Sequence, residues 1–126
     1  KIKKRATTKW IKSVANKYNK QIGDIYYLFC TDEKILEINR QFLNHDFYTD
    51  IIAFDYSEEN KISGDIFISL ETVLSNSQKY QTSFDEELHR VMIHGILHLC
   101  GLNDKSDDEI KEMRKAEDEA LRMLNL

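Results

Sequence analysis

The sequence predicts an α+β fold, in which a small mixed β-sheet is packed by several helices. Apolar residues recur at helical spacing in five segments, and three short runs rich in aromatic and β-branched residues lie among them. The resulting order is helix, strand, helix, two strands and three helices, which is typical of an α+β domain. A length of 126 residues fits one domain, so we expect residues 1–126 to form a single domain.

The first third of the chain is predicted to contain a helix, a strand and the start of a second helix. The first helix is expected to open near Thr7 or Thr8, either of which can cap it, and Gly23-Asp24 is expected to end that unit. Residues 25–30 are an aromatic and β-branched run, which indicates a buried strand.

The middle of the chain is predicted to form a β-hairpin followed by a helix. A polar connection at residues 43–49 precedes the first strand, at residues 51–54. A polar turn at residues 57–63 separates that strand from the next, at residues 65–70. A helix at residues 71–80 is expected to follow.

Capping residues mark the starts of three helices. Asp32 can cap the second helix. The pairs Ser83 with Glu86 and Ser106 with Glu109 are expected to be capping boxes, in which each side chain satisfies an orphan backbone amide. The first box opens an apolar helix that carries two histidines, and the second opens the last helix, which is expected to reach about residue 124.

The composition favours a globular protein without a membrane segment. Of the residues, 41% are hydrophobic and 32% are charged, and no apolar run approaches the roughly 20 residues of a membrane span. The two cysteines, Cys30 and Cys100, make no disulfide framework in a chain of this length, which favours a reduced, cytoplasmic setting. A net charge of −4 argues against broad non-specific nucleic-acid binding. The basic residues between Lys1 and Lys12 are either a solvated helix face or a contact with phosphates.

His94, His98 and Asp104 form a candidate metal site. The two histidines lie four apart in an apolar helical run, so their side chains project from one helix face, about 40° apart. Gly101 stands where a left-handed C-terminal cap residue would stand, and a turn there can bring Asp104 back over the last helical turn. Catalytic zinc takes three protein ligands and leaves one position for water. The alternative interpretation is a pair of core histidines bonded to backbone carbonyls.

Gly95 bears on both the packing and the chemistry of this helix. A glycine inside a helix costs about 1 kcal/mol relative to alanine, so its presence indicates that another element approaches the backbone closely. Gly95 also stands where zincin metalloproteases, with their H-E-x-x-H motif, have the glutamate that acts as general base. The sequence therefore disfavours peptidase activity.

Three blocks of this sequence resemble the YbeY-type rRNA maturation factors, in the same order along the chain. H-G-I-L-H-L-C-G-L-N-D at residues 94–104 resembles the family pattern H-G-x-L-H-L-x-G-Y-D-H. Residues 38–54, which include I-N-R-Q-F and T-D-I-I-A-F, resemble L-N-x-x-Y-R-x-x-D-x-P-T-D-V-L-S-F. G-D-I-F-I at residues 64–68 resembles the strand that follows in the family. The resemblance covers about residues 10–104.

The resemblance implies a metal-dependent endoribonuclease. It implies an α+β fold with a zincin-like metal-binding helix and one Zn²⁺ ion, or another divalent transition metal, held at the positions of His94, His98 and Asp104. It also implies cleavage of single-stranded RNA in 16S rRNA 3′-end maturation and ribosome quality control. The expected partners are single-stranded rRNA and the small ribosomal subunit, in the cytoplasm. The family usually has a further strand ahead of the first helix, which this sequence would lack.

The sequence departs from the family pattern at three positions. Asp104 replaces the family's third histidine; a carboxylate is a legitimate zinc ligand, but a harder one, which broadens the choice of metal toward manganese or iron. Leu43 replaces an arginine, the natural group for clamping a phosphate, and Arg40 or His45 are candidates to take its place. Tyr48 replaces a proline. No side-chain general base is assigned, which leaves a metal-bound water as the nucleophile.

Two other functions remain open. The protein is alternatively a ribosome-assembly factor that binds RNA or protein, with a structural metal and little cleavage activity. Two histidines and one carboxylate are also the facial triad of oxygen-dependent iron enzymes.

Five further residues have a side chain that could act in or near the site. His45 is expected to lie in an exposed loop or to face the metal, and His89 to lie at the surface or beside the ligands. Asp50 and Asp65 are expected at strand starts, where aspartates satisfy turn amides. Cys100 is expected in the core.

Overall fold

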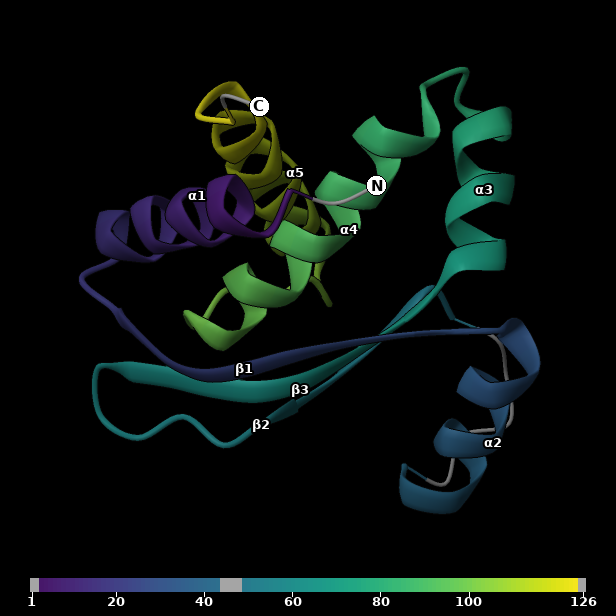
Figure 1. Cartoon of the computed structure of the whole chain (residues 1–126), viewed down its shortest axis with the longest axis horizontal. Helices are drawn as coiled ribbons and strands as arrows, with labels where there is room; N and C mark the ends of the chain where they lie inside the picture. Colours follow the sequence, from purple (N-terminus) through teal and green to yellow (C-terminus); the bar gives the residue numbers. More distant parts are fainter. Residues whose placement is uncertain (1–2, 44–48, 125–126) are drawn as a thin grey trace.

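The computed structural model describes residues 3–43 and 49–124, and it confirms the α+β fold class. In this part of the chain five helices pack against a small mixed sheet (Figure 1). The elements are, in order, α1 (Lys4–Lys17), β1 (Gln21–Cys30), α2 (Asp32–Phe42), β2 (Ile51–Asp55), β3 (Lys61–Ser69), α3 (Leu70–Lys79), α4 (Phe84–Leu99) and α5 (Asp107–Arg122). No helix among these residues is long and apolar enough to span a membrane.

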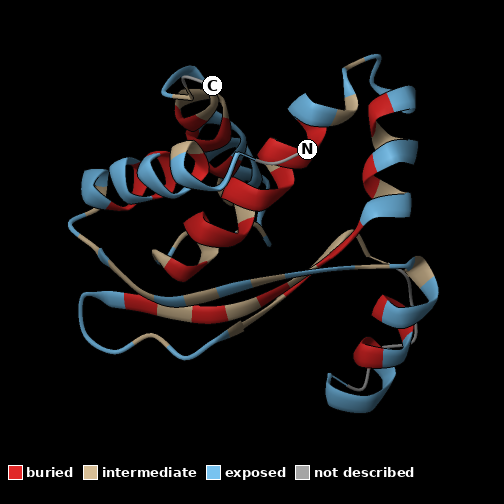
Figure 2. Ribbon diagram, in the orientation of Figure 1, coloured by how far each residue is buried: buried red, intermediate tan, exposed pale blue. Residues whose placement is uncertain are grey.

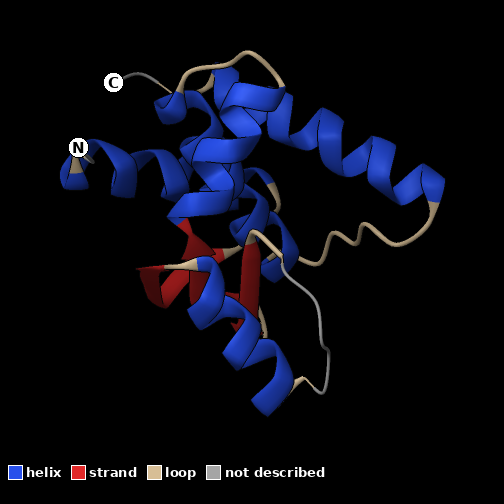
Figure 3. Ribbon diagram, turned by 90° about the vertical axis from the view of Figure 1, so that its right-hand side faces the viewer, coloured by secondary structure: helices blue, strands red, loops and turns tan. Residues whose placement is uncertain are grey.

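The three strands form one sheet in the order β1-β3-β2. The predicted hairpin is confirmed, because β2 pairs antiparallel with β3 and places Ile52 opposite Phe67. The outer strand β1 pairs parallel with β3, and its register shifts between Ile22 and Ile25. In Figure 3 the strands lie together on one side of the main group of helices.

The predicted limits of the first helix and the predicted start of the first strand are wrong, whereas the strand ends at Cys30 as predicted. α1 begins at Lys4, without a side-chain cap, and ends at Lys17. The turn that follows is made by Asn19 at φ +59°, a left-handed conformation that asparagine tolerates. Gly23 does not end the unit but lies inside β1, at the register shift, where an added Cβ would lie 2.2 Å from Oγ of Ser63. The glycine thus serves close strand approach and not a turn.

The first strand is not buried as predicted. None of the residues of β1 is buried, and Tyr26 on it is 61% exposed. The cause is its position at the edge of the described sheet, a position that an aromatic run does not distinguish from a central one. The central strand is β3, on which Ile66 and Ile68 are fully buried (Figure 2).

The two faces of the sheet carry different apolar clusters, because side chains alternate along a strand. Ile66 and Ile68 pack in the main core with α1, α4 and α5, where Trp10 Nε1 donates to the carbonyl of Ala120 over 2.7 Å. A smaller cluster joins α2 to Ile52 of β2 and to Phe67. α4 is therefore the central helix, and the sheet supports one of its faces.

Helix starts agree with the predicted caps only in part. Thr31, and not Asp32, caps α2, since its hydroxyl accepts from the amide of Lys34. The Ser106–Glu109 capping box is complete. At α4 the Ser83 hydroxyl accepts from the amide of Glu86, but the reciprocal bond is not formed, so the predicted box there is half correct.

Candidate metal centre

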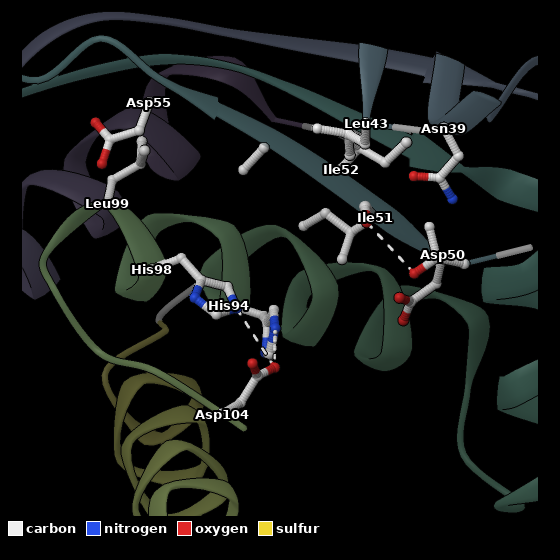
Figure 4. A pocket seen from close by; sticks show the side chains of 12 residues that line it. Asn39, Leu43, Asp50, Ile51, Ile52, Asp55, His94, His98, Leu99 and Asp104 are labelled. Atoms are coloured by element: carbon white, nitrogen blue, oxygen red, sulfur yellow. Dashed lines mark hydrogen bonds and ion pairs between the residues drawn. The ribbon is translucent and has the colours of Figure 1, made fainter. Parts of the chain in front are cut away.

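His94, His98 and Asp104 converge at the C-terminal end of α4 (Figure 4). Oδ2 of Asp104 lies 3.3 Å from Nε2 of His94 and 3.4 Å from Nε2 of His98. One donor atom from each residue lies within 4.8 Å of the others. The three side chains are 19%, 31% and 37% exposed, in the order His94, His98, Asp104, so a substrate can reach them from one side.

The turn after α4 explains how Asp104 returns to the helix. Gly101 has φ +106°, and its amide donates to the carbonyl of His98 over 3.0 Å. The next amide, that of Leu102, donates to the carbonyl of Leu97 over 3.0 Å. These two bonds define a Schellman motif with glycine at the left-handed position. The local sequence therefore reverses the chain directly beside the last helical turn, as predicted.

The distances from Asp104 to the two imidazoles fit a small divalent ion. Ligands that lie about 2.0–2.1 Å from a tetrahedral zinc ion are about 3.3–3.4 Å from one another. The two distances from Asp104 to the imidazoles match this spacing. Nitrogen and carboxylate ligands suit zinc, and they also suit manganese or iron.

Hydrogen bonds at the far side of each imidazole set its orientation. Nδ1 of His94 lies 2.6 Å from Oε2 of Glu117 on α5, and Nδ1 of His98 lies 3.0 Å from the carbonyl of Leu102. Both acceptors require a protonated Nδ1 when the ring is neutral, which leaves the Nε2 lone pair facing Asp104. Metal-ligating histidines commonly have a partner of this kind. The Schellman turn therefore positions two groups around His98: Asp104 at its Nε2 and the carbonyl of Leu102 at its Nδ1.

Charged groups around Glu117 stabilise its ionised form. Nη1 of Arg90 lies 2.9 Å from Oε1 of Glu117, and the other guanidinium nitrogen lies 2.7 Å from Asp118. Burial alone would raise the pKa of Glu117, but its hydrogen bonds with His94 and Arg90 lower that pKa below the usual value. Burial likewise lowers the pKa of His94, but its bond to Glu117 and the nearby carboxylate charges outweigh burial and raise this pKa.

A cleft of about 470 Å³, within the range of ligand clefts, opens on the three residues. Its opposite wall comes from α2 and β2 and includes Leu43, Asp50 and Ile52 (Figure 4). Burial raises the pKa of the Asp50 carboxyl. The sequence suggested a turn-stabilising role for Asp50, whereas the structure places it at the cleft, across from the candidate ligands.

Other sequence predictions around the site have mixed outcomes. His89 does not lie at the surface; it is buried, with its ring edge against Trp10 and its Nδ1 2.6 Å from the carbonyl of Asp85. Asp65 lies inside β3 and not at its start. Cys100 packs against the main core as expected, and burial raises the pKa of its thiol to about 11. His45 lies outside the described residues.

Sequence reasoning missed Glu117. Nothing in the sequence analysis assigns Glu117 a role in the site, yet it is 5% exposed and bonds to a candidate ligand 23 residues away. One signal was available: Glu117 adjoins Ala116 on the stripe that includes Met113 and Ala120, all of them buried. A carboxylate beside an apolar stripe needs a partner, because an unpaired buried charge is costly.

Comparisons with known proteins agree with the sequence blocks and the fold. A family model described as Endoribonuclease YbeY matches residues 1–125. A Bacteroides fragilis protein named Endoribonuclease YbeY is 64% identical over 97% of this chain and 88% of its own length. One of the same name from Porphyromonas gingivalis is 54% identical over 98% of this chain and 82% of its own length.

A solved structure shares the fold. The solution structure of TM1509 from Thermotoga maritima superposes with a TM-score of 0.69, over 95% of this chain and 79% of that chain, at 26% identity. The family match spans nearly the whole chain, and the identity to its named members is high over most of their lengths. This chain belongs to the Endoribonuclease YbeY family.

Proposed function

We propose that this protein is a metal-dependent endoribonuclease that cleaves single-stranded RNA, and that residues 1–126 act as one domain. The observation that carries the proposal is the convergence of three ligand atoms, with both imidazoles held through Nδ1 so that Nε2 faces Asp104. His94, His98 and Asp104 are the proposed ligands of one ion, zinc in the first instance. The names of the relatives supply the substrate class.

The residues of the site have three separate roles in the proposed reaction. A divalent metal held by the three ligands would polarise a phosphoryl oxygen. It would also lower the pKa of a bound water, so that a hydroxide nucleophile is available near neutral pH. Glu117 and the Leu102 carbonyl fix the two imidazoles, so the ligands need little rearrangement. Asp50 lies across the cleft with a raised pKa, which suits a carboxyl that exchanges a proton with the RNA or with water.

The biological target is part of the proposal. We propose that the RNA is 16S rRNA near its 3′ end, that the partner is the small ribosomal subunit, and that the protein also serves ribosome quality control in the cytoplasm. The family resemblance supports this target. Cys30 and Cys100 are free thiols, as a reducing compartment favours.

One observation favours a second candidate function. Leu43, at the position of the family's arginine, lines the wall of the cleft opposite the candidate ligands, so an apolar side chain lies where a phosphate clamp is expected. A ribosome-assembly factor that binds RNA or protein through a structural metal, with little cleavage, would tolerate this replacement.

RNA cleavage by the metal-loaded protein distinguishes the two functions. Wild-type protein, a His94→Ala/His98→Ala variant and a control variant at an exposed position outside both clefts, Glu33→Ala, are incubated with the same single-stranded RNA. The proposal predicts cleavage by wild type and by Glu33→Ala, and none by the double variant. Equal cleavage by all three would assign the activity to a contaminant, and no cleavage by any of them would favour the binding factor.

A further inference from the structure

A second cleft, of about 580 Å³, adjoins the candidate metal centre on the side away from Leu43. It shares Asp50, His94 and Asp104 with the first cleft, so the two are continuous at the candidate ligands. Its floor is α4, and its walls are α3 on one side and α5 on the other. An extended ligand, such as a single-stranded RNA, that passes over the candidate metal centre can therefore continue from one cleft into the other.

The two clefts differ in their positive charges. Among the described residues that line the first cleft there is no lysine or arginine. The second cleft is lined by Arg90, Lys111 and Arg114. A polyanion such as RNA gains much of its affinity from such side chains. The described lysine and arginines therefore favour the second cleft as the path of the RNA phosphate backbone.

Two of these three cations are available to a ligand. Both guanidinium ends of Arg90 are engaged, by Glu117 and by Asp118. Lys111 makes no ion pair with any described residue, and it is exposed. The side chain of Arg114 is 58% exposed, and its one ion pair with a described residue, to Oε1 of Glu117, is long at 3.5 Å.

The opposite wall of this cleft carries an exposed aromatic ring. Tyr80, at the C-terminal end of α3, is 53% exposed and lines the cleft together with Asn76. Nζ of Lys79 lies 5.3 Å from the centre of the Tyr80 ring. Exposed aromatic rings beside a positively charged groove are the usual platform on which unpaired bases stack.

Of the four carboxylates that line this cleft, Glu87 and Glu117 are buried, and Asp50 and Asp104 lie where it joins the first cleft. Glu117 is buried and bonds to His94 and Arg90, and Glu87 is buried with a pKa that burial raises. Asp104 belongs to the candidate ligand set. Among the residues of α5 that line the cleft, the exposed charged ones are Lys111 and Arg114, whereas Glu117 is buried.

We propose that this second cleft is the binding track for single-stranded RNA on one side of the cleavage site, with Lys111 and Arg114 contacting backbone phosphates and Tyr80 stacking on a base. This proposal rests on the proposed endoribonuclease function and gives its substrate a path relative to the metal centre. It also identifies α5 as the source of the phosphate contacts that Leu43 cannot make.

Binding of a labelled RNA as a function of salt tests the track. The probe is a fluorescein-labelled oligouridylate of about twelve nucleotides, within the usual site sizes, and a denaturing gel checks that it stays intact. Lys111→Gln/Arg114→Gln is compared with Lys115→Gln/Arg122→Gln. The control pair lies on the same helix, is exposed and removes the same two charges, but lines neither cleft.

The track predicts a specific change in salt dependence. Loss of two phosphate contacts should weaken binding about tenfold and reduce the slope of log affinity against log salt by about 1.4, at about 0.7 per contact for single strands. The control pair should leave the slope unchanged. Lys111→Gln alone, which disturbs no ion pair, should reduce the slope by about 0.7. Tyr80→Leu should weaken binding with no change of slope. Tyr56 is also an exposed ring, at 60%, and lies outside both clefts, so Tyr56→Leu should bind as wild type.

The outcomes separate this track from the proposed function. Equal affinity and slope for the cleft pair and the control pair would overturn the track, even if the metal-loaded wild type cleaves RNA. Slopes as predicted, in a protein that cleaves nothing, would support the track and contradict the endoribonuclease. Circular dichroism melting of each variant, expected to match wild type, confirms that altered binding reports contacts and not unfolding.

Discussion

Oε2 of Glu117 lies 2.6 Å from Nδ1 of His94, and this contact ties α5 to the candidate metal centre on α4. Glu117 also forms an ion pair with Arg90 of α4. Arg90, Glu117 and His94 therefore contact one another in series. The arrangement is the carboxylate–histidine–metal relationship that orients a ligand and increases its basicity.

Removal of the Glu117 charge should weaken metal binding. We expect Glu117→Gln to reduce zinc affinity about tenfold or more, because the isosteric amide keeps the shape but supplies a weaker acceptor to Nδ1. Asp118→Asn is the matched control, since Asp118 shares Arg90 with Glu117 but does not contact His94. Competition with a chromophoric chelator measures both affinities. The same affinity in both variants would remove Glu117 from the metal centre.

The left-handed turn at Gly101 should be costly to replace. Gly101→Ala should destabilise the protein by about 1 kcal/mol and weaken metal binding, because alanine disfavours φ +106° and the turn places Asp104. Apart from Gly101 and its chain neighbours, no described residue has an atom within 4 Å of the added Cβ, so crowding is not the cause. Urea unfolding, with Lys105→Ala as the control in the same loop, measures the change. Unaltered stability and metal affinity would contradict this role for the turn.

Gly95 should resist substitution for a different reason. An added Cβ would lie 3.1 Å from atoms of Ile51 and Ile66 on the sheet, which is the close approach that the helix sequence indicated. Overpacking costs about 1–3 kcal/mol, against about 1 kcal/mol gained in helix propensity, so we expect a net loss on Gly95→Ala. Thermal melting of Gly95→Ala and of Gly95→Ala/Ile66→Val tests the cause. The smaller valine should restore part of the packing, and a more stable Gly95→Ala would show that the contact is not tight.

Asp50 should make stability depend on pH. Burial raises its pKa in the folded state, so the native protein binds this proton more tightly than the unfolded chain does, and stability is lost as pH rises through the folded pKa. Asp50→Asn should therefore stabilise the metal-free protein at neutral pH. The difference should vanish below about pH 3, where aspartate is protonated in both states. Urea unfolding at several pH values, with exposed Asp24→Asn as control, gives the comparison; a constant difference at all pH values would contradict the raised pKa.

Local patterns were sufficient to predict the fold class, the hairpin and the meeting of the three candidate ligands. The histidine spacing and Gly101 encode that geometry within eleven residues of chain, through a helix and the turn that ends it. The zincin-like character of α4 stays a prediction.

Features that depend on distant partners were not predictable in the same way. The exposure of β1 depends on which strand is central, and this is set by its parallel pairing with β3, about 40 residues away in sequence. The bond between Glu117 and His94 similarly requires the packing of α5 on α4. Asp50 directly precedes β2, and it reaches the site only because β2 lies beside α4. The sequence does not show that packing, so it suggested an ordinary aspartate at a strand start.

The location of the bound metal tests the central claim most directly. Anomalous diffraction at the zinc edge from crystals of the zinc-loaded protein should show one peak about 2.0–2.2 Å from Nε2 of His94, Nε2 of His98 and a carboxylate oxygen of Asp104. The account predicts that this peak is absent from crystals of His94→Ala/His98→Ala grown under the same conditions. A zinc peak elsewhere in the wild type, or ligation through Nδ1 with the bonds to Glu117 and Leu102 broken, would contradict it.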